Sequence, residues 1–262
     1  MKYILRSIRS NLSRALLCPR FLLCVAISLV IQLMGVWDII AMEGLNVTYL
    51  FFWLMQLGTF QILLLCVPAM VYSDSFLEDL KGSVIRFSVQ RSGVFKYLFA
   101  KYIATLLSGF AVMTVSFLIF LAALCICFPL DDYGTVMNIV DIVSGSYSQL
   151  IVDKKSFLYL FTNIVHQGIC GAFYAGMALA CSTFIDNSFV VIAAPILLGQ
   201  WSGTLRNLTG MKYSLMDIQF GTTELTGTLE SSRAALVLFI PLITICGILF
   251  IWNGKRRVYE AL

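Results

Sequence analysis

His166 and Gln167 are the strongest candidates for a binding or catalytic site, because these two polar residues are adjacent within an apolar segment. An ionisable group in such a segment is a functional candidate by default. We expect a neutral imidazole that hydrogen-bonds a neighbouring helix, and a polar ligand site at His166 and Gln167 stays open as the alternative. His166 is the only histidine, so a metal site with two or three imidazole ligands is excluded.

Catalytic motifs are otherwise absent from the sequence. It has no glycine-rich Walker loop, so the chain does not bind ATP by the P-loop route. The apolar segments lack paired carboxylates and histidine clusters, which argues against an enzyme embedded in the membrane. The eight cysteines lie within or beside these segments, where small buried side chains are more common than disulfides. We therefore expect no catalytic activity, no cofactor and no metal.

The composition is that of a membrane protein. Of the 262 residues, 60% are hydrophobic and only 12% are charged, whereas roughly a quarter of the residues in soluble domains are charged. Backbone amides in lipid must be hydrogen-bonded within their own segment, which favours helices, and the apolar runs do not alternate as barrel strands would. We predict an all-α, polytopic membrane protein that forms a single permease domain over residues 1–262.

Six apolar segments are candidate transmembrane helices, which need about 20 residues to cross the hydrocarbon; the first and fifth are short and must include flanking residues. The expected spans are residues 20–41, 49–72, 97–128, 157–182, 187–204 and 234–253. Most of the 18 Lys and Arg residues precede the first span, follow the second or follow the last. Because basic residues stay in the cytoplasm, we expect both termini in the cytoplasm of a bacterial-type plasma membrane. The net charge of +4 reflects this bias and does not indicate nucleic-acid binding.

Two of the expected cytoplasmic segments carry amphipathic patterns. Residues 1–19 place apolar side chains at helical spacing opposite arginines, which predicts a helix in the membrane interface. Within the loop of residues 73–96, Ser75 and Glu78 fit a capping box, so a short helix is predicted to begin at Ser75. This loop is longer and more apolar than a simple linker needs to be.

Two further features concern helix packing and the opposite side of the membrane. The expected outer loop of residues 205–233 is long for a connector, and a short re-entrant or interfacial helix is expected around residues 212–218. In the fourth span, small residues recur every four positions and allow close approach of helix backbones. This stripe consists of Gly168, Ala172, Gly176 and Ala180. We favour a contact within the chain and keep a subunit interface open.

The segment leading into the third span resembles the corresponding loop in membrane subunits of ABC-2 type transporters. The resemblance rests on the run Glu78-Asp-Leu-Lys-Gly-Ser, followed by Arg86, Gln90-Arg-Ser-Gly, Lys96-Tyr and Lys101-Tyr. It extends to the plan of nearly the whole chain: a basic N-terminal helix, six spans, and a longer outer segment before the sixth.

This resemblance implies the permease subunit of an ATP-driven exporter, in which the 73–96 loop docks on a separate ATP-binding subunit. The implied coupling residues are Ser75, Phe76, Glu78, Asp79, Leu80, Lys81, Gly82, Arg86 and Arg91. A second permease subunit, identical or different, would complete the substrate pathway. The substrate would be an antimicrobial or other peptide, or a lipid-linked compound. The implied partners are these two subunits and membrane lipid, without nucleic acid.

A different interpretation needs no ATP-binding partner. The chain would then be a secondary transporter or the substrate-binding membrane subunit of an energy-coupling importer. Either would need a polar ligand site within the spans, around His166, Gln167 and Asn163 or around Gln56 and Gln61. Coupled transporters usually keep ionisable relays in the membrane, and His166 is the one candidate in these spans.

Overall fold

The fold was determined as a computed structural model, which describes residues 2–40, 45–57, 61–82, 84–130, 146–210, 214–220 and 228–261. These residues are mostly helical, and no strand occurs among them, which confirms the all-α prediction. The helices are α1 (Lys2–Leu16), α2 (Pro19–Val36), α3 (Val47–Leu57), the 3-10 helix η1 (Gln61–Leu65), α4 (Val67–Tyr72), α5 (Ser75–Lys81), α6 (Val84–Ser92), α7 (Val94–Cys127), α9 (Ser148–Val152), α10 (Ser156–Cys181), α11 (Ser188–Thr209), α12 (Leu215–Phe220) and α13 (Thr228–Ala261).

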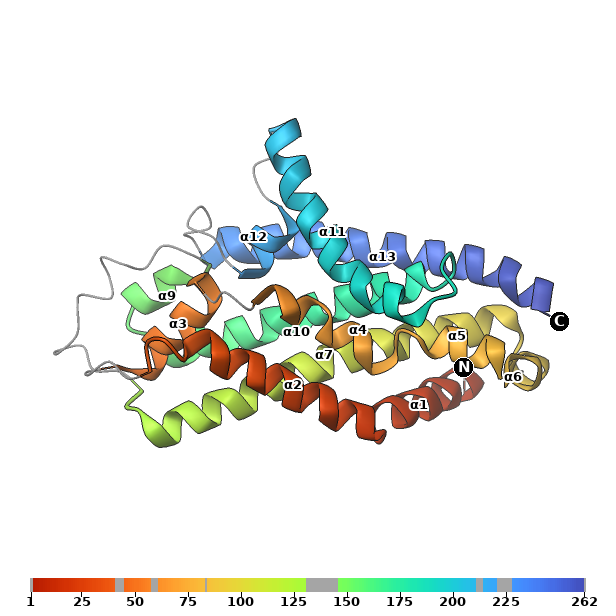
Figure 1. Cartoon of the computed structure of the whole chain (residues 1–262), viewed down its shortest axis with the longest axis horizontal. Coiled ribbons are helices and arrows are strands. Elements are labelled where there is room, and N and C mark those ends of the chain that lie inside the picture. Colours follow the sequence, from red (N-terminus) through yellow and green to blue (C-terminus); the bar gives the residue numbers. More distant parts are fainter. Residues whose placement is uncertain are drawn as a thin grey trace.

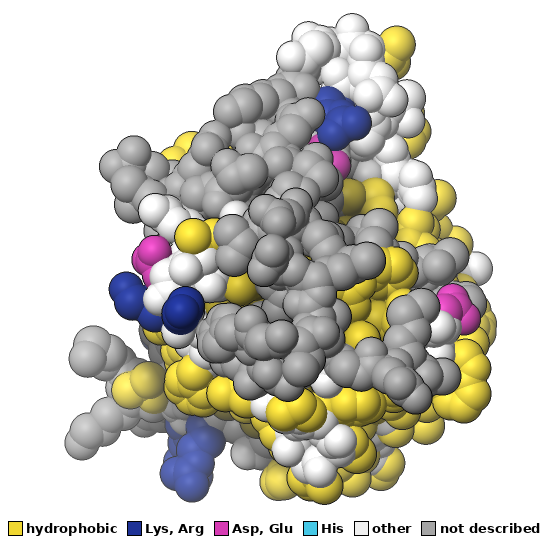
Figure 2. All heavy atoms as spheres, turned by 90° about the vertical axis from the view of Figure 1, so that its left-hand side faces the viewer, with side chains coloured by type: hydrophobic (Ala, Val, Ile, Leu, Met, Phe, Trp, Pro, Cys, Tyr) yellow, Lys and Arg dark blue, Asp and Glu magenta, His cyan; other side chains and the backbone are white. Residues whose placement is uncertain are grey.

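Five helices in the described part of the chain are long and apolar enough to cross a membrane, namely α2, α7, α10, α11 and α13. Large apolar side chains on their outer surfaces are exposed, among them Leu22, Ile126, Trp201 and Trp252. On the end of the molecule that Figure 2 shows, hydrophobic side chains make up much of the described surface and charged side chains are few. An apolar exterior suits lipid and would be unfavourable in water. The architecture is that of a multi-pass membrane protein.

The expected second span, residues 49–72, is not one continuous helix, contrary to what an unbroken transmembrane helix would require. The structure divides it into α3, η1 and α4, and residues 58–60 lie outside the described part. Pro68 stands in the first turn of α4, where its missing N–H is tolerated but would interrupt a longer helix. The segment is largely buried, with Leu50, Phe51 and Leu65 at 0% exposure. Its apolar residues therefore form protein core, where a broken helix at membrane depth is permitted.

Helices α7 and α10 form the central pair of the bundle, and their backbones meet at two glycines. A Cβ atom added to Gly171 would lie 2.6 Å from the carbonyl oxygen of Gly109, closer than real contacts allow. Two members of the small-residue stripe also pack on α7, Gly168 against Phe110 and Thr114 and Gly176 against Leu106 and Tyr102. Ala180 is buried in a cluster with residues of α7 and α13, whereas Ala172 is half-buried. The stripe therefore lies largely within the chain.

The long helices α2, α7, α10 and α13 run along one long axis, whereas α11 leaves the bundle at a steep angle (Figure 1). The two chain ends lie at the same end of the bundle, together with α1, α5 and α6 (Figure 1). Helices α9 and α12 lie toward the opposite half. The amphipathic helix predicted over residues 1–19 corresponds to α1, which ends at Leu16 before Pro19 opens α2.

Candidate functional site

Helix α5 forms the centre of the candidate site and begins at Ser75, as predicted. The capping box is not formed, and that part of the prediction is wrong. Asp74 is the N-cap residue and makes no side-chain cap bond, while the buried Ser75 hydroxyl has no hydrogen-bond partner among the described residues. The Ser75 carbonyl instead accepts a hydrogen bond from Lys101. Tertiary contacts with α7 hold the start of this helix in place of a local cap.

The inner face of α5 packs into the bundle through two apolar side chains. Phe76 is fully buried and meets Phe250 of α13 edge-on, with ring centroids 5.3 Å apart. Leu77 is buried with Ala178 of α10 and Val191 of α11. Leu80 is partly buried against both of these groups of side chains, the one around Phe76 and the one around Leu77. A helix of seven residues is not stable alone, so these contacts fix its position and orientation.

A buried ion pair joins α5 to α7, and it connects two residues that sequence reasoning did not pair. The Lys101 ammonium donates to the Asp79 carboxylate and to the Ser75 carbonyl, the latter at 2.9 Å. The Tyr97 hydroxyl donates to the same carboxylate at 2.6 Å. The side chains of Lys101 and Asp79 are 0% and 3% exposed. Such a pair holds its partners in one geometry, because separating them would leave a buried charge uncompensated.

Further ion pairs join this region to α1 and α2. One Arg20 nitrogen lies 2.8 Å from a Glu78 oxygen and another lies 3.4 Å from Asp74. Arg14 of α1 approaches the second oxygen of Asp79 at 3.7 Å. Burial raises the pKa of Asp74, and the Glu78 carboxylate raises it further, whereas Arg20 lowers it. The first two helices are therefore tied electrostatically to α5.

The outer face of α5 and α6 is open. Lys81, Gly82 and Arg86 are exposed, and Phe87 is 67% exposed. The side chain of Arg91 lies outside the described part of the chain. The α5–α6 hairpin thus has an inner face fixed by ionic and aromatic contacts and an outer face that carries basic and aromatic groups.

His166 and Gln167 lie far along the bundle from this hairpin, where they hold α12. His166 Nε2 is 2.8 Å from the Ile218 carbonyl oxygen, and its Nδ1 is 3.2 Å from the Tyr147 hydroxyl. A carbonyl only accepts, so Nε2 carries the proton. Because a charge on this buried ring would be costly, Nδ1 carries no proton and accepts from the tyrosine. The buried ring is then neutral, and both nitrogens are occupied. This geometry is the one expected for an imidazole bonded to a neighbouring element.

The remaining polar candidates of this region are also engaged. Gln167 donates to the Gln219 carbonyl at 2.8 Å, and Asn163 donates to the Tyr159 carbonyl one turn earlier at 2.9 Å. The side chains of Gln56 and Gln61 lie outside the described part. The geometry around His166 is therefore that of a structural latch for α12.

Helix α12 corresponds to the short helix expected around residues 212–218, displaced toward the C-terminus. It is also held by α11, because Arg206 pairs with Asp217 at 2.5 Å. The Ser202 hydroxyl accepts from the Leu215 amide at 3.2 Å. Of the expected outer loop, residues 211–213 and 221–227 lie outside the described part.

A further ion pair that the sequence did not predict joins α13 to the segment after α10. Arg257 near the end of α13 lies 2.7 Å from Asp186, which follows α10. The hydrogen bond from this guanidinium lowers the pKa of Asp186. All eight cysteines are free, and no group of three or more metal-ligating side chains occurs among the described residues.

No protein-family model, no curated protein and no solved structure matches the chain.

Proposed function

We propose that the chain is the membrane subunit of an ABC-2 type exporter, and that the α5–α6 hairpin receives force from a separate ATP-binding subunit. One observation carries the proposal: the hairpin is locked into the bundle on its inner face and open on its outer face. A surface that transmits force from a partner subunit must be accessible to that partner and fixed to the rest of the bundle. The sequence resemblance places the coupling helix of the family at residues 75–82, which is the position of α5.

The contacts of α5 identify the helices that a displacement of α5 would move. Displacement of α5 would carry α7 through the ion pair of Asp79 with Lys101. It would carry α13 through the ring contact of Phe76 with Phe250, and α2 through Arg20. Two packings of the bundle, biased by the ATP-binding partner, would then alternate as a population shift.

The proposal includes a topology and an assembly. The broken segment α3–η1–α4 counts as the second of six spans, and both chain ends and the hairpin face the cytoplasm of a bacterial plasma membrane. Two permease subunits, identical or different, enclose the pathway. The substrate is a peptide, such as an antimicrobial peptide, or a lipid-linked compound. The chain itself hydrolyses no ATP.

Co-purification of ATPase activity tests the coupling. We expect the tagged full chain, extracted in mild detergent, to bring with it a Walker-motif subunit and ATPase activity. Phe87→Ser and Lys81→Glu should lower the co-purified activity severalfold. Phe157→Ser is the matched control, because Phe157 is 71% exposed and stands at the start of α10, away from the hairpin. An unchanged activity in both hairpin variants would refute the assignment.

Cysteine labelling tests the topology. Lys81→Cys introduces a thiol on the exposed hairpin, and native Cys125 and Cys127 are exposed at the other end of α7. A membrane-impermeant maleimide applied to intact cells should modify the two native thiols and spare position 81, as mapped by mass spectrometry of peptides. Modification of position 81 from outside would show that the hairpin does not face the cytoplasm.

A further inference from the structure

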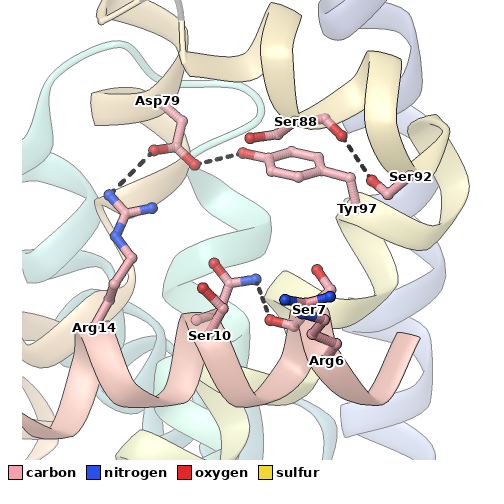
Figure 3. Close-up of a pocket in the computed structure, with 9 residues that line it drawn as sticks. Arg6, Ser7, Ser10, Arg14, Asp79, Ser88, Ser92 and Tyr97 are labelled. Atoms are coloured by element: carbon pink, nitrogen blue, oxygen red, sulfur yellow. Dashed lines mark hydrogen bonds and ion pairs between the residues drawn. The ribbon is translucent and has the colours of Figure 1, made fainter. Parts of the chain in front are cut away.

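A polar pocket of ≈ 570 Å³ lies between α1 and the start of α7, beside α6 (Figure 3). Figure 3 shows Arg6, Ser7 and Ser10 on one wall, along α1, and Ser88, Ser92 and Tyr97 on the facing wall. The complete lining is Arg6, Ser7, Ser10, Asn11, Arg14, Asp79, Ser88, Ser92 and Tyr97. Its volume falls in the range of about 300–1,000 Å³ that is usual for small-molecule sites.

The charge of this pocket is positive. Arg6 and Arg14 contribute two guanidinium groups, and Asp79 is the one acid in the lining. The charge of Asp79 is balanced by Lys101, which is fully buried and does not line the pocket. Arg6 makes no ion pair with any residue that the structure describes. The guanidinium groups of Arg6 and Arg14 therefore give the pocket a net positive charge that no residue of its lining neutralises.

The hydrogen-bonding groups around it suit an anion with several oxygens. The hydroxyls of Ser7, Ser10 and Ser88 can each donate one bond, whereas the Ser92 hydroxyl already donates to the Ser88 carbonyl at 2.8 Å. Guanidinium groups bind carboxylate and phosphate oxygens through two parallel N–H donors. A carboxylate offers two oxygens, but the opposing walls offer donors on several sides, which fits the tetrahedral array of a phosphate group better.

We propose that this pocket binds a phosphate-bearing anionic ligand, with its phosphate group between Arg6 and Arg14. The ligand is the headgroup of an anionic phospholipid or a soluble phosphate compound. The basic, amphipathic character of α1, which forms one wall, favours the lipid source. The inference does not rest on coupling to an ATP-binding subunit, because it uses only the pocket.

Binding would change the contact between α1 and α5. Arg14 lies 3.7 Å from Asp79, beyond normal hydrogen-bond distance, and its side chain is 54% exposed. This guanidinium is therefore free to turn toward a ligand, while Lys101 and Tyr97 continue to hold the carboxylate. The ligand would join α1 to the α6–α7 wall and stiffen the region that contains the hairpin.

A thermal-shift titration of the full chain in neutral detergent tests the proposal. The probes are phosphatidylglycerol, phosphatidylcholine and inorganic phosphate, each added in steps. We expect a saturable rise in melting temperature with phosphatidylglycerol and none with phosphatidylcholine. Arg6→Gln should weaken this binding about tenfold, because it removes a charge-assisted contact without breaking an internal ion pair. Arg9→Gln is the matched control, since Arg9 is an exposed arginine on α1 that does not line the pocket.

The outcomes distinguish a lipid headgroup from a soluble phosphate compound, and they can refute the proposed binding site. A response to phosphatidylglycerol alone, lost in Arg6→Gln, assigns the pocket to lipid. A response to inorganic phosphate with the same dependence on Arg6 assigns it to a soluble compound. If Arg6→Gln binds as the wild type does, or if Arg9→Gln weakens binding equally, the pocket is not the site and general charge attraction explains the response. Absence of any response also overturns it.

Discussion

Substituting the two members of the buried ion pair, singly and together, measures how strongly α5 is held to α7. Asp79→Asn keeps the shape of the side chain and removes its charge, which leaves Lys101 as a buried cation with the Ser75 carbonyl and the Tyr97 hydroxyl as neighbours. Lys101→Met leaves the carboxylate with Tyr97 and the more distant Arg14. The double variant places two neutral side chains in the same space.

The magnitude follows from burial. Exposed ion pairs contribute about 1 kcal/mol or less, but side chains at 0% and 3% exposure belong to the buried class, in which loss of one partner costs about 3–5 kcal/mol. Asp79→Asn should lie near the lower limit, about 3 kcal/mol, because carbonyl acceptors for the ammonium remain. Lys101→Met should cost somewhat less, since Arg14 is near. The double variant should lose only about 1 kcal/mol, because no charge stays uncompensated.

Thermal unfolding of the purified chain in detergent provides the assay. At about 2–4 °C per kcal/mol for a chain of this size, Asp79→Asn should lower the melting temperature by roughly 6–12 °C. Arg256→Gln serves as the control, because it breaks the exposed pair of Arg256 with Glu260, and it should have little effect. If the double variant loses as much as the two single variants together, the pair is not coupled and the argument from burial fails.

Three other substitutions have defined outcomes. Gly171→Ala should lower the melting temperature by several degrees, because its Cβ would collide with the Gly109 carbonyl, whereas Gly203→Ala on α11 meets open space and should be neutral or stabilising. His166→Leu should speed hydrogen exchange in residues 214–220, because α12 loses its bond to the imidazole; unchanged exchange would contradict the latch. Burial raises the pKa of Asp74 above its ordinary value of 3.8, so the native state binds the extra proton first and wild-type stability rises as pH falls through that raised pKa. Melting curves between pH 7 and 4 should show this rise in wild type and not in Asp74→Asn.

The sequence was sufficient for the features that depend on local pattern. Periodicity predicted α1, the apolar runs predicted α2, α7, α10, α11 and α13, and the residue types around Ser75 predicted where α5 begins. The bounds were less accurate. The third span was expected to begin at residue 97 with Lys96 in the preceding loop, because a charged side chain is unfavourable in the hydrocarbon, whereas α7 already begins at Val94 and includes Lys96 in its first turn.

Features that depend on tertiary contact were not available from the pattern. Lys101 and Asp79 are 22 residues apart, and nothing in their spacing indicates that they meet. The same holds for Arg257 and Asp186, which are 71 residues apart. The break in residues 49–72 was missed for a different reason. Hydropathy records that a side chain avoids water, but it does not tell whether lipid or protein covers that side chain.

The contacts also indicate which helices would move together under the proposed function. Helices α7 and α10 meet backbone to backbone at Gly109 and Gly171, and a tight packing of this kind cannot slide without a clash. Helix α5 is fixed to that pair by its buried charge and to α13 by its aromatic ring. These four helices therefore form one unit. Helix α11 leaves the bundle (Figure 1) and is attached near its start through Val191 and at its far end through α12. Only four of the 22 residues of α11 are buried, so displacement of the hairpin should shift the four-helix unit relative to α11.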